Sequence, residues 1–227
     1  MLVLGIDTAT DVCAVGLVRG ATPLVDLSVR VPRSHGTRLA PLVTEALAHA
    51  GLAAPDLDAV AVSAGPGSYT GLRIGLSLAK GLCLAADAAL VAVPTLDALA
   101  RVVQRESGTR LVVPCLPSRR GEVYAAAYRP GVAGLATLRD AAPVALANVP
   151  DWLGEPDTAV ALCGPAADAV RDSLPQAQTV IVPGVASGLV IARMGADRAE
   201  AGDTESVAAY EPDYLKPFVS GDGIARG

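Results

Sequence analysis

The order of strand-like and helix-like segments in the first hundred residues restricts the fold more than any other feature of this sequence. Three short apolar or alternating runs come first, and the tight connections between them predict an antiparallel meander. Apolar residues then recur at helical spacing between 39 and 50, and two further strand–helix pairs follow. The predicted strands are 2–7, 13–20, 24–32, 57–67 and 89–93, and the predicted helices are 34–51, 70–87 and 95–106.

This order, β-β-β-α-β-α-β-α, is typical of the domains of actin, Hsp70 and hexokinase. The second half contains a similar mixture of strand and helix patterns, and the sequence SGT at 107–109 marks the seam. We therefore predict an α/β protein with two actin-like lobes of the ASKHA, ribonuclease H-like class, each a mixed sheet flanked by helices. The first lobe is expected at 1–106 and a smaller second lobe at 107–227, with a C-terminal helix able to pack back on the first lobe.

Composition excludes several functional classes. Hydrophobic residues make up 52% of the chain and charged residues 18%, which is enough apolar material for packed cores. The net charge of −5 and the 3% aromatic content disfavour a basic nucleic-acid surface or a base-stacking platform, so any contact with tRNA is expected to be indirect. Charged residues interrupt the longest apolar stretch, 72–89, and no secretory leader is recognisable, so we expect a cytoplasmic protein without a membrane span.

Two turns at strand ends have the residue types of phosphate-binding loops. One is IDTATD, and the other is AGPGSYTG, which leads into a helix whose N-terminus would attract anions. However, the glycine spacing and the lack of lysine in the second turn match neither the P-loop nor the dinucleotide-binding pattern. We expect vestigial phosphate turns, with no tightly bound cofactor and at most a weak contact with ATP or ADP. The residues of these turns are Asp7, Thr8, Gly65, Gly67 and Ser68.

Each turn also has a simpler interpretation. The spacing in the first turn favours side-chain caps of a tight turn by Asp7 and Thr8 over a phosphate site. In the second turn, Thr70 is expected to cap the helix that follows.

The helix at 70–87 has a row of small residues along one face. Gly71, Gly75 and Ala79 recur every four residues, and glycine inside a helix costs about 1 kcal/mol relative to alanine. Either the row packs tightly on the chain's own sheet, or it packs against a helix of another subunit; the sequence leaves both open. The predicted partner interface comprises Leu39, Leu42, Val43, Ala46, Gly71, Leu72, Gly75, Leu78, Ala79 and Leu82.

Side chains suited to catalysis are scarce. His35 and His49 are the only histidines, their spacing matches no metal motif, and no cysteine has a neighbouring histidine. The four cysteines are far apart and are expected to be reduced, buried thiols. Near Glu122, two arginines suggest an ordinary Arg–Glu pair in a hairpin-like bend. We predict no catalytic residues and no metal site; the alternatives are a small actin-like-fold kinase or nucleotide-binding protein, and a protease.

Five stretches carry a resemblance to a known family that spans nearly the whole chain. They are LGIDTATDVCAVGL, SHGTRLAPLV, AGPGSYTGLRIGLSLAKGL, GEVYAAAY and EPDYLK. The sequence is similar to the TsaB (YeaZ) family, the dimerization subunit of the bacterial tRNA threonylcarbamoyladenosine system. The family usually has an aspartate where this chain has Pro117, so any role of that carboxylate is in doubt here.

The resemblance implies a function as well as a fold. It implies a non-catalytic scaffold that pairs through first-lobe helices with a TsaD-like catalytic paralogue, is joined by a TsaE-like ATPase, and forms a homodimer when alone. The complex would transfer threonylcarbamoyl to the adenosine 3′ of the anticodon in tRNAs that read codons starting with A. The metal-binding HxxxH of the paralogue aligns with Thr95 and Leu99, neither of which is a histidine.

Overall fold

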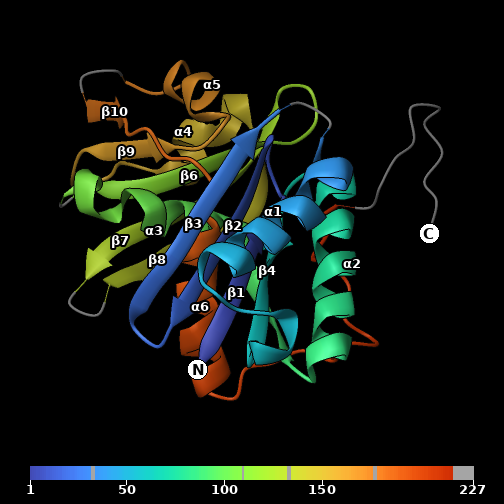
Figure 1. Cartoon of the computed structure of the whole chain (residues 1–227). Helices are drawn as coiled ribbons and strands as arrows, with labels where there is room; N and C mark the ends of the chain where they lie inside the picture. The colour runs from blue at the N-terminus through green and yellow to red at the C-terminus, as the bar shows by residue number, and fades with distance from the viewer. Residues whose placement is uncertain (32–33, 109, 132–133, 176–177, 217–227) are drawn as a thin grey trace, which may run out of the picture. The chain divides into compact units, whose positions relative to one another are not determined.

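The computed structural model describes residues 1–31, 34–108, 110–131, 134–175 and 178–216 (Figure 1). The chain divides into two compact units, each built around one five-stranded mixed sheet within the described residues. Of the described residues, the first unit contains those within 1–98 and 186–213, and the second contains those within 99–185 together with 214–216. The boundary at 98/99 lies inside a helix, and residues 186–213 belong to the first unit although they come late in the sequence. The sequence instead predicts a single boundary between residues 106 and 107.

The sheet of the first unit has the order β3-β2-β1-β4-β5. The strands β1, β2 and β3 form the antiparallel meander, and β4 and β5 continue the sheet in parallel with β1. The sequence predicts this order correctly because the runs before the first helix are too tightly connected for anything but hairpins. The bounds are β1 Leu2–Asp7, β2 Val12–Arg19, β3 Thr22–Arg30, β4 Ala59–Gly65 and β5 Ala89–Pro94.

Helices cover both faces of this sheet. The helices α1 (His35–His49) and α2 (Tyr69–Ala86) pack on the face that holds Leu4, Val15 and Val62. The opposite face holds a separate apolar cluster built with α6 (Gly188–Glu200). Figure 1 shows α1 and α2 in front of the strands and α6 behind them. Because successive residues of a strand point to opposite faces, the continuously apolar strands bury both of their sides.

Glycine allows α6 to lie unusually close to the sheet. A Cβ atom built at Gly5 would collide with the α6 backbone, and one built at Gly188 would collide with the β2 backbone. The Ser187 hydroxyl caps α6 by accepting a hydrogen bond from the Val190 N–H at 3.2 Å. The small side chains on both surfaces therefore let backbone pack against backbone.

The sheet of the second unit repeats the connectivity of the first. Its order is β10-β9-β6-β7-β8, in which β6, β7 and β8 are antiparallel and β9 and β10 continue in parallel with β6. The bounds are β6 Leu111–Pro117, β7 Glu122–Gly131, β8 Gly134–Ala145, β9 Val160–Cys163 and β10 Thr179–Ile181. The helices are α3 (Thr95–Ser107), which starts in the first unit, α4 (Val149–Leu153) and α5 (Ala167–Arg171).

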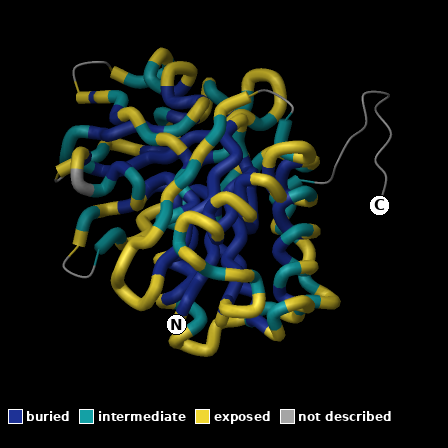
Figure 2. Tube along the Cα trace, in the orientation of Figure 1, coloured by how far each residue is buried: buried dark blue, intermediate teal, exposed yellow. Residues whose placement is uncertain are grey.

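Two units with one shared connectivity confirm the predicted class of two actin-like lobes. Figure 2 shows buried residues concentrated in the central strands, with exposed residues on the outer helix faces, in the turns and along the outermost strands β3 and β8. Short 3₁₀ helices at Ala54–Asp56 and Leu146–Asn148 connect elements within the two units.

Candidate functional site

The two turns that resemble phosphate loops lie next to each other at the ends of β1 and β4. The Ser68 N–H donates to the Ala9 carbonyl oxygen at 2.8 Å, and the Thr8 N–H donates to the Ser63 hydroxyl oxygen at 3.3 Å. Parallel pairing of β1 with β4 places their carboxyl ends at the same edge of the sheet, which is why the turns meet. Sequence reasoning found both turns but not the hydrogen bonds that join them.

Asp7 is directed into its own turn. Its Oδ1 atom accepts a hydrogen bond from the Ala9 N–H at 2.9 Å, and only 1% of the residue is exposed. Burial raises the pKa of the Asp7 carboxyl, while the bonds to Ala9 and Ser63 and the nearby His35 lower it in part. The carboxyl group therefore acts here as a turn cap, which is the simpler interpretation that the spacing favours.

Thr8 joins the first turn to α2. Its hydroxyl donates to the Gly71 carbonyl oxygen at 2.8 Å, and the residue is completely buried. A Cβ atom built at Gly75 would collide with this hydroxyl oxygen, and one built at Gly71 would collide with the Thr8 carbonyl oxygen. The small-residue row of α2 thus packs on the chain's own first turn, which decides between the two packing alternatives.

The start of α2 differs slightly from the prediction. The helix begins at Tyr69, and Ser68 rather than Thr70 caps it by accepting a hydrogen bond from the Gly71 N–H at 3.2 Å. A cap side chain reaches the amide three residues later, and Ser68 has this relation to Gly71. The cap satisfies one of the free N–H groups that would otherwise attract an anion.

A cavity of about 500 Å³ opens beside the two turns, between the first residues of α1 and α2. Its described lining contains hydroxyl groups, one carboxylate and one imidazole, but no lysine or arginine; the His35 ring lies 3.3 Å from the Val12 carbonyl oxygen through Nε2. A polyphosphate normally needs cationic or several free N–H partners, so this lining does not favour one. The lining residues are Thr10, Asp11, His35, Gly36, Ser68, Thr70, Gly71 and Ile74.

The predicted partner interface needs correction. Most of its residues are buried inside the first unit, and only Leu78 and Leu82 keep partial exposure. An apolar stripe at helical spacing is the face that a helix turns to its own core, so the same pattern cannot also supply the outer surface. The buried members are Leu39, Leu42, Val43, Ala46, Gly71, Leu72, Gly75 and Ala79.

The outer face of α2 carries a different set of residues. Leu84 is the most prominent, because 77% of it is exposed. Arg73 lies above the Tyr69 ring, 5.3 Å from its centre, and donates a hydrogen bond to its hydroxyl. We define the outer α2 face as Arg73, Ser77, Gly81, Leu84 and Ala85, which are all exposed.

Glu122 of the GEVY stretch has a partner that sequence reasoning missed. Its carboxylate pairs with the Lys216 ammonium group and accepts a hydrogen bond from the Ser118 hydroxyl at 2.7 Å. These two contacts hold the pKa of Glu122 below its ordinary value. The charge of the neighbouring Arg119 also lowers this pKa, in line with the expected Arg–Glu interaction. The pair with a lysine 94 residues away is an additional contact, which no local pattern could indicate.

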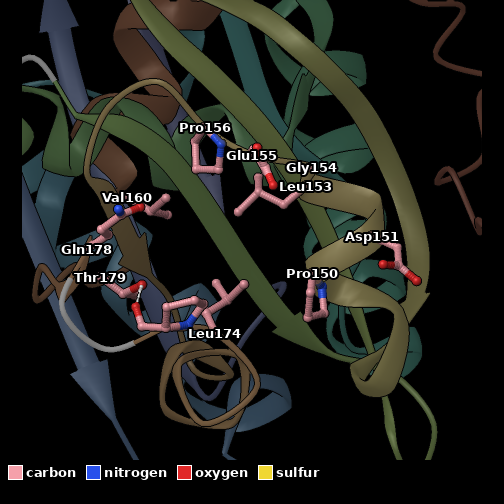
Figure 3. Close-up of a pocket in the computed structure, with 11 residues that line it drawn as sticks. Pro150, Asp151, Leu153, Gly154, Glu155, Pro156, Val160, Leu174, Gln178 and Thr179 are labelled. Atoms are coloured by element: carbon pink, nitrogen blue, oxygen red, sulfur yellow. Dashed lines mark hydrogen bonds between the residues drawn. The ribbon is translucent and has the colours of Figure 1, made fainter.

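A second cavity, of about 710 Å³, lies in the second unit between α4 and β10 (Figure 3). Proline and leucine side chains form much of its wall, and the exposed carboxyl groups of Asp151 and Glu155 lie at its margin. Thr179 uses its hydroxyl to bond the Pro175 carbonyl oxygen at 3.0 Å. No described lining residue is a histidine, cysteine, lysine or arginine, so this cavity lacks the usual side chains for nucleophilic or metal-assisted chemistry.

Within the described residues, no group of three or more His, Cys, Asp or Glu side chains is arranged to hold a metal ion. The Nε2 atom of His49 lies 3.5 Å from the Oε1 atom of Glu45 on α1, and both side chains are exposed. In the same part of the chain, no helix has the combined length and apolar character needed to cross a membrane.

Comparisons with known proteins identify the family. The family model described as "TsaD: tRNA N6-adenosine threonylcarbamoyltransferase" matches residues 29–209. The tRNA threonylcarbamoyladenosine biosynthesis protein TsaB of Escherichia coli is 39% identical over 129 residues, which cover 57% of this chain and 55% of that protein. The chain belongs to the TsaB/YeaZ family. The corresponding TsaB of Bacillus subtilis is 36% identical over 129 residues, covering 57% of this chain and 56% of that protein.

Solved structures extend the TsaB/YeaZ likeness to the whole fold. YeaZ from Pseudomonas aeruginosa superposes with a TM-score of 0.82 at 25% identity, covering 94% of this chain and 99% of that chain. A more distant structure, component A of the (R)-2-hydroxyglutaryl-CoA dehydratase of Acidaminococcus fermentans, superposes with a TM-score of 0.54. At 12% identity, over 88% of this chain and 99% of that chain, it shows a shared fold only. In sequence, the matches span little more than half the length of the curated TsaB relatives.

Proposed function

We propose that this TsaB/YeaZ-family chain is a non-catalytic scaffold in tRNA threonylcarbamoyladenosine biosynthesis. It pairs with a TsaD-like catalytic paralogue and is joined by a TsaE-like ATPase, and it forms a homodimer when the paralogue is absent. The complex transfers threonylcarbamoyl to the adenosine 3′ of the anticodon in tRNAs that read codons starting with A. The names of the relatives and the description of the family model both support a place in this TsaD-related pathway.

The observation that carries the scaffold role is the contrast between the turns and the outer α2 face. In the turns, the polar groups of Asp7, Thr8 and Ser68 bond to the chain itself. In contrast, α2 exposes Leu84 and Ala85 near its C-terminal end and a hydrogen-bonded Arg73–Tyr69 pair near its start. Arginine and aromatic residues around an apolar centre are typical of protein–protein interfaces.

The remaining parts of the proposal concern cofactors, contact with tRNA and location. The chain binds no cofactor tightly, and any contact with ATP or ADP is weak and belongs to the assembled complex. It touches tRNA at most indirectly, in keeping with its net charge of −5. A cytoplasmic location suits its four free, buried cysteines, all of which lie in the described residues.

The experiment uses the intact chain with the TsaD-like protein of the same host. We expect Leu84→Glu to weaken their association at least tenfold, because a carboxylate would be buried without a partner in an apolar contact. The melting temperature of the isolated chain should stay within about 1–2 °C of the wild type, because surface substitutions usually change stability by less than 0.5 kcal/mol. Leu138→Glu, at a 45% exposed leucine of β8, is the matched control and should bind normally.

Transfer activity completes the test. Threonylcarbamoyl transfer should require both proteins and should fall with Leu84→Glu in proportion to the lost association. Transfer by the purified chain alone, or full association of Leu84→Glu with the TsaD-like protein, would contradict the scaffold proposal or its location on α2.

A further inference from the structure

The cavity of the second unit has a floor that belongs to the apolar core of that unit. Figure 3 shows the side chains that line it arranged around a central hollow of about 710 Å³. Leu153 and Val160 are buried in the core, and Leu174 packs against it. Because these three residues also line the cavity, its floor is continuous with the packed interior. An apolar cavity of this size is typical of binding sites.

Local structure holds the walls of the cavity in place. Three of the lining residues, Pro150, Pro156 and Pro175, are prolines, whose fixed φ angle leaves little freedom to lose when a ligand binds. The Gly154 N–H donates to the Pro150 carbonyl oxygen at 2.9 Å, where α4 ends. On the other side, the Thr179 hydroxyl donates to the Pro175 carbonyl oxygen at 3.0 Å. The cavity is therefore already formed in the chain by itself.

Two carboxylates give the margin of the cavity a negative charge. Asp151 lies on α4, Glu155 follows two residues after the end of this helix, and both are exposed. Neither carboxylate forms an ion pair with another described residue, whereas Asp157 pairs with Arg129 at 3.3 Å. The described lining also contains no lysine, arginine or histidine. The charge at this margin is thus complementary to a cation that comes from outside the chain.

We propose that this cavity is a docking site for a segment of a partner protein that carries a lysine or arginine next to an apolar side chain. The apolar side chain packs on Leu153, Val160 and Leu174. The cation lies at the margin, beside Asp151 and Glu155. An apolar centre with a polar rim is the usual arrangement of a protein–protein contact.

The exposure of both carboxylates favours a protein segment over a small molecule as the occupant. A small ligand usually has most of its surface buried in its pocket, whereas a group that reaches these carboxylates lies at the open margin. The proposal is independent of the scaffold role of α2, because all residues of the docking site belong to the second unit and α2 belongs to the first.

A titration of the intact, isotopically labelled chain followed by NMR tests the proposal. The probe is the tripeptide leucyl-lysyl-leucine, acetylated and amidated at its ends. We expect it to shift the amide signals of Gly154, Glu155 and Thr179, with a dissociation constant in the millimolar range. The blocked tripeptides leucyl-glutamyl-leucine and seryl-lysyl-serine should each bind at least fivefold more weakly, because one lacks the cation and the other lacks the apolar side chains.

Two double variants separate the margin from the rest of the surface. Asp151→Asn with Glu155→Gln should weaken binding of leucyl-lysyl-leucine about three- to tenfold, which is the effect of losing two exposed charge pairs. The matched control, Glu106→Gln with Asp140→Asn, removes two exposed carboxylates of the same unit that do not line the cavity, and it should bind like the wild type. All four side chains are exposed, so both double variants should fold normally.

Three results would overturn the proposal. The first is the absence of shifts at the lining amides up to about 20 mM leucyl-lysyl-leucine. The second is equal binding of leucyl-glutamyl-leucine, or an equal loss of affinity in the control variant. The third is binding of hexylammonium chloride as tight as that of the tripeptide, which would assign the cavity to a free amine. Failure of the chain to bind the TsaD-like protein would refute the proposed function and leave this docking site standing.

Discussion

A substitution at Gly75 would show how closely α2 depends on the first turn. In Gly75→Ala, the new methyl group would have to displace the Thr8 hydroxyl, which is completely buried and donates to Gly71. Overpacking costs about 1–3 kcal/mol, and the strained hydrogen bond costs about 1 kcal/mol more. Alanine returns about 1 kcal/mol through its higher helix propensity. The net expectation is a loss of about 2 kcal/mol in the free energy of unfolding.

The same helix contains its own control. Gly81 is exposed, and a Cβ atom there would have no heavy atom within 4 Å, so Gly81→Ala should gain helix propensity without any collision. For a chain of this size, 1 kcal/mol corresponds to about 2–4 °C in melting temperature. Thermal unfolding should therefore show Gly75→Ala about 4–8 °C below the wild type and Gly81→Ala at or above it.

The partner in the collision can also be tested. Thr8→Ala removes the hydroxyl, so the double variant with Gly75→Ala should be less destabilised than the sum of the two single variants. Equal melting temperatures for Gly75→Ala and Gly81→Ala would refute the packing described here. Additive effects of Thr8→Ala and Gly75→Ala would show that the methyl group is accommodated elsewhere.

The remaining predictions concern titration and thiol reactivity. Burial raises the pKa of Asp7, so the ionised carboxylate destabilises the folded state; this destabilisation is absent below the unfolded-state pKa and grows as pH rises through the folded-state pKa. The melting temperature of Asp7→Asn minus that of the wild type should therefore increase from pH 4 to pH 7. A decrease of this difference would refute a raised pKa for Asp7. Burial raises the pKa of Cys13 and Cys83 to about 11 and that of Cys163 to about 12. At pH 8 a thiol reagent should thus label the native chain at least 100-fold more slowly than the denatured chain, and rapid labelling without unfolding would contradict the burial.

Local patterns predict the strands, helices and connectivity of the first unit well. Hairpin connections, a helical stripe and alternating strand–helix pairs each depend on residues close in sequence, so their signals survive without tertiary context. Helix ends depend on single caps and are less certain, as Ser68 shows where Thr70 is expected. The family stretches were recognisable for the same reason, since each is a short, contiguous run.

The side of each helix that faces a partner was not predictable in this way. Gly71, Gly75 and Ala79 form a small row that suits either an internal or an external contact, and the neighbour decides between them. The tertiary structure supplies that neighbour, Thr8, which lies 63 residues before Gly71. It also places Leu84 on the outer surface of α2, whereas Leu72 and Leu76 of the same helix are buried.

By itself, the sequence determined the elements of this protein, their order and the two-lobed class, because periodicity and turn chemistry are written in neighbouring residues. Only the tertiary structure decided what the special residues do. Gly75 makes room for Thr8, and Glu122 pairs with Lys216. Each of these roles depends on an atom that the fold brings within a few ångströms from dozens of residues away, and such proximity arises only when the chain has packed.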